Sequence, residues 1–260
     1  MSTETKENTS KDPAIVAAEQ EKLAAKKQEA KELLRSLVVA GSHLGHPTHK
    51  RNPKMDSYIH SVKNGMHIID LTQTVSNMMR AGEFLKKQVR LGRNILLVGT
   101  SKHSSALIKQ EAERAGVYFI NQRWLGGLIT NFEIIRSRLN KLRELEHMRD
   151  TGGFKGLGKK EIAALNRQIS KLNKSLGGLK KMKGRPDVVL VVDQNKDALA
   201  ITECKKQGNI SLISIVDTDC DPSGINFPIP ANDDSIGSVS FVLKYFADII
   251  SNAKQKTMKR

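Results

Sequence analysis

The sequence is poor in aromatic residues and contains only two cysteines. Aromatic side chains account for 4% of its 260 residues, and the single tryptophan is Trp124. Cys204 and Cys220 are too few for a disulfide framework, and they indicate a reducing compartment. The chain is therefore not a small disulfide-stabilised domain, and its length is sufficient to bury a hydrophobic core.

The sequence also lacks long apolar segments. No stretch approaches the roughly 20 apolar residues of a membrane-spanning helix. The first residues, MSTETKENTSKDP, lack the apolar centre of a signal peptide, and their acidic groups disfavour an organelle transit peptide. Together with a mean hydropathy of −0.40, these absences predict a soluble protein with no membrane partner.

Acidic residues are scarce in the middle of the chain. The formal net charge of the whole chain is +16. Residues 41–183 carry a net charge of +17, whereas residues 1–40 are neutral and residues 184–260 carry −1. A localised positive excess indicates a surface that faces a polyanion. Since no basic amphipathic anchor or lipidation motif occurs, nucleic acid is favoured over a lipid surface.

Apolar strands and amphipathic helices alternate over most of the chain. Segments such as NILLVGT and DVVLVVD are apolar without interruption, which is typical of parallel strands buried on both faces. The alternation predicts an α/β fold, a parallel sheet with helices on both faces. The predicted strands cover residues 66–71, 94–100, 117–120, 187–193 and 210–217. The predicted helices run from about 72 to 92, up to 115, over 196–207 and over 235–253.

Residues 131–178 interrupt this alternation. Two amphipathic helices are predicted there, joined by TGGFKGLG at 151–158. The first helix follows a capping box, Thr130-x-x-Glu133. Each helix has an apolar seam at spacings of three and four residues, so we expect an antiparallel coiled-coil hairpin.

Two glycine pairs flank the predicted hairpin. Gly126-Gly127 precedes it and Gly177-Gly178 ends it, and glycine permits the sharp turns that an inserted unit needs. Trp124 lies just before the first pair. We expect its side chain to pack at the base of the hairpin and to hold the insertion to the body. Stacking of the indole on a nucleotide base is the alternative.

These patterns divide the chain into segments. We expect a flexible, charged N-terminal extension over residues 1–32, whose later part, from Asp12, can be helical. An α/β body is expected over 33–130 and 179–253. The hairpin over 131–178 is inserted into that body, and a basic tail follows over 254–260.

Motifs for cofactors and catalysis are incomplete. GFKGLGK at 153–159 matches the spacing of a phosphate-binding loop. However, Lys160 replaces the hydroxyl residue that holds Mg²⁺, and no strand precedes the glycines. The strand at 94–100 is not followed by a dinucleotide-binding glycine pattern, and no G-x-S-x-G occurs. We therefore expect no cofactor and no catalytic residues.

Asp193 and Asp217 come at the ends of predicted parallel strands. In α/β enzymes, this edge of the sheet holds catalytic groups. With Lys102 they define the alternative hypothesis, an enzyme that binds a phosphorylated substrate. Capping of their own loops is favoured, because no nucleophile or base motif accompanies them.

Three histidines are spaced by three residues in HLGHPTH. His43, His46 and His49 allow a zinc site, but a fourth ligand at standard spacing is absent. We expect no metal. The alternative is a loop in which His46 and His49 form hydrogen bonds to backbone or phosphate.

A basic loop, HKRNPKM, follows directly. Pro53 stiffens this loop, so less conformational entropy is lost when its cations bind phosphates. With the cations elsewhere in the middle of the chain, the loop predicts an RNA-binding surface. The predicted RNA-binding residues are Lys50, Arg51, Asn52, Lys54, Lys63, Lys102, Arg123, Arg136, Lys155, Lys159 and Lys160.

Several segments resemble a known family. GSHLGHPTHKRNPKM, HIIDLTQTV, NQRWLGGLITNF, LNKSLGGLKKM and VDTDCDPSGINFPIPANDDSI follow the order and spacing of the bacterial-type small-subunit ribosomal protein S2 family. The resemblance covers about residues 33–253. The chain departs from it at Arg51, where the family usually has an aromatic residue. A phosphate contact is therefore expected there in place of stacking.

The resemblance implies a fold and partners. It implies a flavodoxin-like parallel α/β body with a projecting helical hairpin, located in the ribosome of a bacterial cytoplasm or an organelle. It implies contact with 16S-type rRNA between the head and body of the small subunit. It also implies contact with neighbouring ribosomal proteins, including the OB-repeat mRNA-binding protein where that partner exists.

Overall fold

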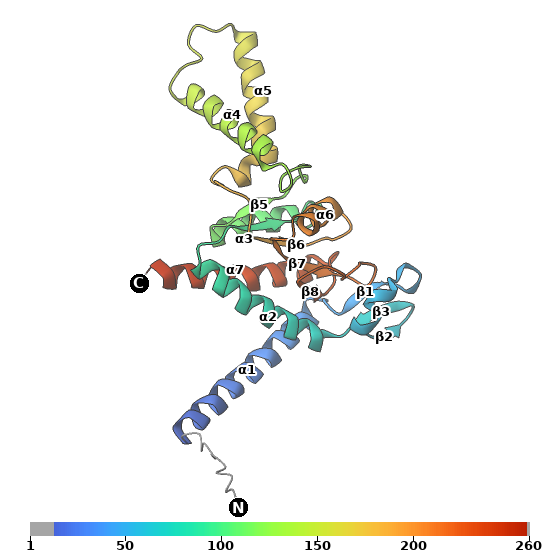
Figure 1. The fold of residues 1–260 in the computed structure, drawn as a ribbon. Helices are drawn as coiled ribbons and strands as arrows, with labels where there is room; N and C mark the ends of the chain where they lie inside the picture. The colour runs from blue at the N-terminus through green and yellow to red at the C-terminus, as the bar shows by residue number, and fades with distance from the viewer. Residues whose placement is uncertain (1–12, 259–260) are drawn as a thin grey trace, which may run out of the picture.

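The computed structural model describes residues 13–258, which form two sheets and seven α-helices within that range (Figure 1). No helix in this range is apolar over a length that would cross a bilayer. The helices are α1 (Pro13–Val39), α2 (Leu71–Arg90), α3 (Ser105–Ala115), α4 (Phe132–Asp150), α5 (Lys159–Leu176), α6 (Ala198–Gln207) and α7 (Ile236–Met258). The strands are β1 (Leu44–Pro47), β2 (Ile59–Lys63), β3 (Met66–Ile69), β4 (Ile95–Val98), β5 (Tyr118–Ile120), β6 (Val188–Val191), β7 (Ser211–Val216) and β8 (Phe227–Pro230).

The larger sheet is parallel throughout, with the strand order β5-β4-β6-β7-β8. Counted along the chain within this sheet, that order is 2-1-3-4-5, the flavodoxin-like arrangement. The α/β fold class predicted from the sequence is therefore confirmed. Four predicted strands, 94–100, 117–120, 187–193 and 210–217, contain β4 to β7.

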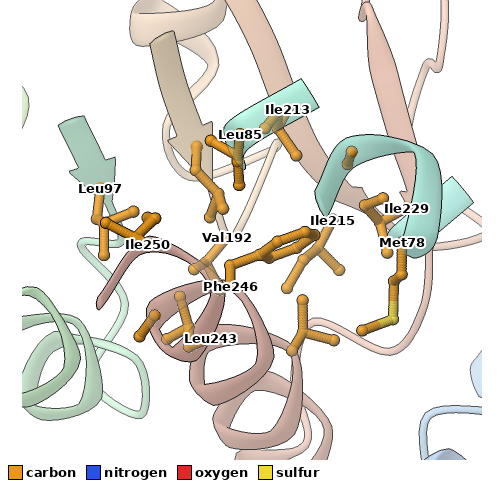
Figure 2. Close-up of a cluster of buried hydrophobic side chains, with 14 of the residues drawn as sticks. Met78, Leu85, Leu97, Val192, Ile213, Ile215, Ile229, Leu243, Phe246 and Ile250 are labelled. Atoms are coloured by element: carbon orange, nitrogen blue, oxygen red, sulfur yellow. The ribbon is translucent and has the colours of Figure 1, made fainter. Parts of the chain in front are cut away.

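Alternate side chains of the strands supply two separate hydrophobic cores. Leu97 and Val192 belong to the core beneath α2, α3 and α7, while Leu96 and Val191 belong to the core on the opposite face. Figure 2 shows Phe246 of α7 among the side chains of the first core. Fully burying such a side chain contributes roughly 1.5–3 kcal/mol. The continuous apolar strands are thus explained by burial on both faces.

The predicted strand at 66–71 does not join the parallel sheet. It forms β3, the central strand of a separate antiparallel sheet with the order β1-β3-β2. Asn64 and Gly65 both have positive φ, as a two-residue hairpin turn requires, and they join β2 directly to β3. This local Asn-Gly turn pairs the strand with its neighbour in sequence, and the helix that follows it, α2, leads into β4, the first strand of the parallel sheet along the chain.

The fifth parallel strand, β8, has the sequence FPIP and was not among the predicted strands. Proline lacks the N–H that a central strand uses for pairing. Pro228 and Pro230 are tolerated because β8 is an edge strand, paired only with β7.

Both ends of the described chain are helical. The extension was placed at residues 1–32 with a helical later part from Asp12, and α1 is continuous from Pro13 to Val39. Leu33 and Leu37 of α1 are buried in the first core. The basic tail was placed at residues 254–260, but α7 continues to Met258. Residues 1–12 and 259–260 lie outside the described range.

Residues 132–176 form the two predicted helices, α4 and α5. Together with their connection, residues 151–158, they are called the helical pair below. Figure 1 shows the pair projecting beyond the β5 edge of the body, with the two helices diverging toward the connection. Glu146 of α4 accepts hydrogen bonds from Asn173 of α5 (2.6 Å) and from Lys180 (2.7 Å). The expected coiled-coil geometry is not confirmed.

The predicted capping box does not form. Thr130 Oγ1 donates to the carboxylate of Glu203, 3.3 Å away, and Asn131 occupies the position before α4 without a side-chain cap. A buried carboxylate from another part of the chain competes for this hydroxyl, and sequence spacing does not reveal that partner.

The four glycines that flank the helical pair differ in what they require. A Cβ atom on Gly178 would collide with the carbonyl oxygen of Phe119, a backbone atom of β5. Gly127 has a φ of +85°, where other residues are strained. Gly177 has helical backbone angles, and a Cβ atom on Gly177 or Gly126 would meet no neighbour closer than 3.8 Å. Only one glycine of each pair is therefore required by the fold.

The neighbouring glycines Gly177 and Gly178 provide a matched test. We expect Gly178→Ala to lower the free energy of unfolding by about 1–3 kcal/mol, because the new methyl group must displace the backbone of β5. Gly177→Ala removes backbone freedom only from the unfolded chain, and we expect it to be neutral or stabilising by about 0.4–1 kcal/mol. Chemical denaturation of the two variants measures both values. Equal destabilisation by the two substitutions would contradict the close approach at Gly178.

Candidate nucleic-acid interface

Parallel strands bring their carboxyl ends to one side of the sheet, which we call the carboxyl edge. Lys102 follows β4 and Arg123 follows β5, and both side chains are exposed. These two strands are neighbours at one end of the sheet. The topology therefore places two predicted RNA-binding residues, 21 positions apart in sequence, on the same part of the molecular surface.

The loop over residues 48–58 contacts the carboxyl edge at the end of β7, away from β4 and β5. The backbone N–H of Asn52 donates to the carbonyl oxygen of Thr218, just after β7, at 2.9 Å. The side chain of Asn52 accepts a hydrogen bond from the N–H of Lys54 (3.0 Å) and starts a 3-10 turn over Pro53–Tyr58. The Asn52 side-chain oxygen, predicted as an RNA contact, thus shapes the loop.

The cations of this loop point to solvent. Lys50 is exposed, as is Lys63 at the end of β2. Arg51 Nε lies 3.2 Å from Asp56, and Lys54 Nζ lies 2.7 Å from Asp221. Such exposed pairs contribute at most about 1 kcal/mol, so a phosphate can replace the carboxylate partner. The hydrogen bond from Lys54 and the N–H of Ser223 lower the pKa of Asp221 to about 2.

The helical pair presents a second set of exposed cations. Lys159 and Lys160 open α5, and Lys155 belongs to the connection before it. The N-terminus of a helix attracts anions, and these lysines strengthen that attraction. Arg136 of α4 is exposed and lies 3.8 Å from Glu133.

Apart from Lys63 in the antiparallel sheet, the predicted residues therefore occupy two regions. Lys102, Arg123 and the 48–58 loop lie at the carboxyl edge, whereas the cations of α4, α5 and their connection project away from the body (Figure 1). Between the two regions lies the segment 121–131, which leads from β5 into α4.

Glu203 of α6 organises this connecting segment. Its side chain is 5% exposed, and one carboxylate oxygen accepts from the indole Nε1 of Trp124 (3.1 Å) and the N–H of Gly127 (2.8 Å). The other oxygen accepts from the N–H of Ile129 (3.1 Å) and from both the N–H and the hydroxyl of Thr130 (3.3 Å each). One buried carboxylate thus fixes the path of the chain into α4.

The hydrogen bonds determine how Glu203 ionises. Burial alone raises the pKa of a carboxyl group, but the donors from Gly127, Trp124, Ile129 and Thr130 outweigh it, and the pKa of Glu203 is lowered. The indole of Trp124 is 6% exposed in the second core, so it packs at the base of the helical pair and presents no free face to a base.

Sequence reasoning missed Glu203. A signal was present, because Glu203 falls among the residues that α6 buries, Ala200, Ile201 and Cys204. An acidic residue on the buried side of a helix requires hydrogen-bond donors. Which donors they are depends on segments more than 70 residues away.

The carboxylates of Asp193 and Asp217, which follow β6 and β7, accept hydrogen bonds within their own loops. Asp193 Oδ1 accepts from the N–H of Lys196 (2.8 Å), and Asp217 Oδ1 accepts from the N–H of Thr218 (2.5 Å). These hydrogen bonds are loop contacts of the kind that the sequence favoured over catalysis.

The three histidines of HLGHPTH do not converge. Within residues 13–258, the donor groups close enough to share an ion include His46 but neither His43 nor His49. Alternate residues of an extended segment point to opposite sides, and His46 faces the ends of β7 and β8. A zinc site of the three histidines is therefore contradicted.

Replacement of Glu203 tests its structural role. We expect Glu203→Gln to lower the free energy of unfolding by about 2–3 kcal/mol, because an amide cannot accept all of these hydrogen bonds. Folding lowers the pKa of Glu203 from 4.5, so its contribution is present above that pH and is lost as the pH falls. The variant should therefore show a smaller loss of stability on acidification than the parent chain.

The control is Glu113→Gln, which changes an exposed glutamate of α3. Urea denaturation at neutral and acidic pH compares the three chains. If the two variants behave alike, the hydrogen bonds to Glu203 do not stabilise the native state.

Comparison with known proteins gives a consistent result. The family model described as ribosomal protein S2 matches residues 37–253. The small ribosomal subunit protein uS2 of Microcystis aeruginosa is 46% identical over 222 residues, which cover 85% of this chain and 83% of the relative. The uS2 protein of Synechocystis sp. is 46% identical over 217 residues, 84% of this chain and 80% of the relative. The uS2c protein of Rhodomonas salina is 46% identical over 218 residues, 84% and 89% of the two chains. The match over most of its length, on a flavodoxin-like fold, shows that this chain belongs to the ribosomal protein S2 family.

Proposed function

We propose that this chain is a structural constituent of the small ribosomal subunit and binds 16S-type rRNA between the head and the body of that subunit. The relatives named above are small ribosomal subunit proteins, and the family is structural and non-enzymatic. Its place is the ribosome, either in a bacterial cytoplasm or in an organelle.

The observation that carries the RNA-binding proposal is the position of the cations. Residues 41–183 hold a net charge of +17, and the predicted contact residues other than the partly buried Asn52 are exposed, most of them at the carboxyl edge or on the helical pair. Lysine and arginine on a surface of this kind contact backbone phosphates and recognise RNA largely by shape. The ion pairs of Arg51 and Lys54 are exposed and therefore weak, so both side chains can exchange their carboxylate partners for phosphates.

The helical pair fits the role of an inserted unit. We place the unit at residues 131–178, within an α/β body of 33–130 and 179–253. Its entry is fixed by Glu203, Trp124 and Gly127, and its exit passes Gly178 packed on β5. A unit held at its base and charged over its length presents Arg136, Lys155, Lys159 and Lys160 to RNA. It also offers contact to neighbouring ribosomal proteins, including the OB-repeat mRNA-binding protein where that partner exists.

The enzyme alternative has less support. It requires Lys102 to act with Asp193 and Asp217, but both carboxylates accept backbone hydrogen bonds in their own loops. Asp217 Oδ2 also faces His46, 3.1 Å away, which belongs to the antiparallel sheet. Membership of a structural, non-enzymatic family also disfavours an enzyme.

The first test is co-sedimentation of the full chain with ribosomal subunits. We expect a tagged full-length chain to sediment with small ribosomal subunits in a sucrose gradient and to remain with them at moderate salt. A chain found only in the free protein fractions, while other small-subunit proteins are in the subunit peak, would overturn the ribosomal assignment.

The second test measures the salt dependence of RNA binding. We expect the triple variant Lys50→Ala, Arg51→Ala, Lys54→Ala to lower the slope of log K against log salt by about two to three units, because each lost phosphate contact removes about 0.7–0.9. Filter binding to full-length 16S-type rRNA between about 50 and 200 mM salt measures the slope.

A triple variant with the same charge change is the control for that measurement. Lys205, Lys206 and Lys244 are exposed and belong to the segment 184–260, whose net charge is −1. Their replacement by alanine should leave the slope unchanged. Equal slopes for the two triple variants would place the RNA footprint away from the 48–58 loop.

A further inference from the structure

A polar pocket lies where the helical pair leaves the body, between α3, the end of β5 and the end of α5 (Figure 1). Its volume is about 370 Å³, which is within the range of pockets that hold small ligands. Lys109 and Glu113 of α3 form one side, Asn121 follows β5, and Asn173 and Lys174 of α5 form the other side. The body and the helical pair therefore both contribute to the lining.

Two asparagine side chains of the pocket are held in a fixed orientation. Asn121 Nδ2 donates to the carbonyl oxygen of Ser105 (3.1 Å), and Asn173 Nδ2 donates to the carboxylate of Glu146 (2.6 Å). Both partners can only accept, so each amide directs its N–H₂ group toward them. The Oδ1 atom of Asn173 lies on the side of Gly177, which also lines the pocket. In the part of the chain that the structure describes, neither Oδ1 atom accepts a hydrogen bond, so both are free for a ligand.

The charged side chains of the pocket are also available to a ligand. Lys109, Glu113 and Lys174 are exposed, and none of them forms an ion pair or a side-chain hydrogen bond within residues 13–258. The pocket thus combines acceptor oxygens, from one carboxylate and two amides, with two cations.

This combination restricts the chemistry of the ligand. Carboxylate and amide oxygens select a group with several N–H donors, whereas lysines select an anion. A nucleotide has both properties, and guanine presents N1–H and N2–H₂ side by side on one edge of the base. A guanidinium group also offers several donors, but the two lysines repel it.

The position of the pocket favours RNA as the source of this nucleotide. Arg123, at the carboxyl edge, follows Asn121 by two residues. On the other side, α5 leads from the pocket to Lys159 and Lys160 at its far end. The pocket therefore lies between the two regions of proposed RNA contacts.

We propose that this pocket receives one unstacked guanine nucleotide of the RNA. Glu113 and the two amide oxygens accept hydrogen bonds from the base, while Lys109 and Lys174 contact the adjacent phosphates. Sequence-specific contacts to RNA are mostly made to unstacked bases of this kind. The inference rests on the proposed RNA binding and adds a base-specific contact to it. Because the base is held between α3 and α5, its binding fixes the helical pair relative to the body.

The test is binding of short RNA by the purified full-length chain. Fluorescence anisotropy measures the affinity for the labelled oligonucleotides UUGUU, UUAUU and UUUUU at one salt concentration. We expect UUGUU to bind about tenfold more tightly than the other two, as one good base contact provides. Glu113→Gln should abolish this preference without lowering the affinity for UUUUU, because an amide presents one acceptor where the carboxylate presents two.

The lysines should act differently from the glutamate. We expect the double variant Lys109→Ala, Lys174→Ala to weaken binding of all three oligonucleotides to a similar extent, because phosphate contacts carry no base preference. The matched controls are Glu32→Gln in α1 and the double variant Lys205→Ala, Lys206→Ala in α6, which change exposed residues outside the pocket. Both controls should keep the guanine preference and the affinities of the parent chain.

Equal affinity for the three oligonucleotides, or a guanine preference that Glu113→Gln retains, would overturn the proposal. Displacement of UUGUU by an equal concentration of GMP or of an arginine pentapeptide would also overturn it, because the ligand would then be a free nucleotide or a protein side chain. Sedimentation with ribosomal subunits separates this inference from the proposed function. If the parent chain sediments with small subunits but shows no guanine preference, the proposed function stands and only the pocket assignment fails.

Discussion

The path of the chain out of the parallel sheet depends on one buried carboxylate. Glu203 binds the indole of Trp124 and the backbone N–H groups between Gly127 and Thr130, so it fixes the direction in which α4 begins. A charged group in the second core is stable only because these donors surround it. The basic helical pair can therefore project from the body while its base stays rigid. The tryptophan is located at a hinge because the hinge needs both a large apolar surface and a donor.

Charge is divided along the carboxyl edge. Its β4 and β5 end carries Lys102 and Arg123 and leads into the basic helical pair, whereas the other end carries the carboxylates that follow β7 and β8. Parallel topology brings all of these loops to one side of the sheet, and the strand order then decides which charges become neighbours. The same edge that holds substrates in many α/β enzymes thus carries positive charge at one end and negative charge at the other.

Much of the fold could be predicted because its signals are local. The continuous apolar segments of β4 and β6 and the periodic apolar positions of α2, α4 and α5 require no knowledge of distant contacts. The predictions failed where contacts with another segment determined the local structure. Met66–Ile69 pairs through an Asn-Gly turn, FPIP is a strand because it lies at an edge, and Thr130 gives its hydroxyl to Glu203. The proposed RNA contacts follow from the cations of a basic segment, whereas their division into two regions needed the fold.

Residue types and their spacing were sufficient to establish the alternation of strands and helices, the concentration of positive charge in residues 41–183 and the resemblance to a family. Each of these is a property that can be read along the chain without reference to distant contacts. Which side chains meet was settled by the packed fold. Trp124 and Glu203 are separated by 79 positions, and His46 and Thr218 by 172. Contacts over such separations follow from the strand order and from the docking of β1, because only the packed sheets bring those residues within hydrogen-bond distance.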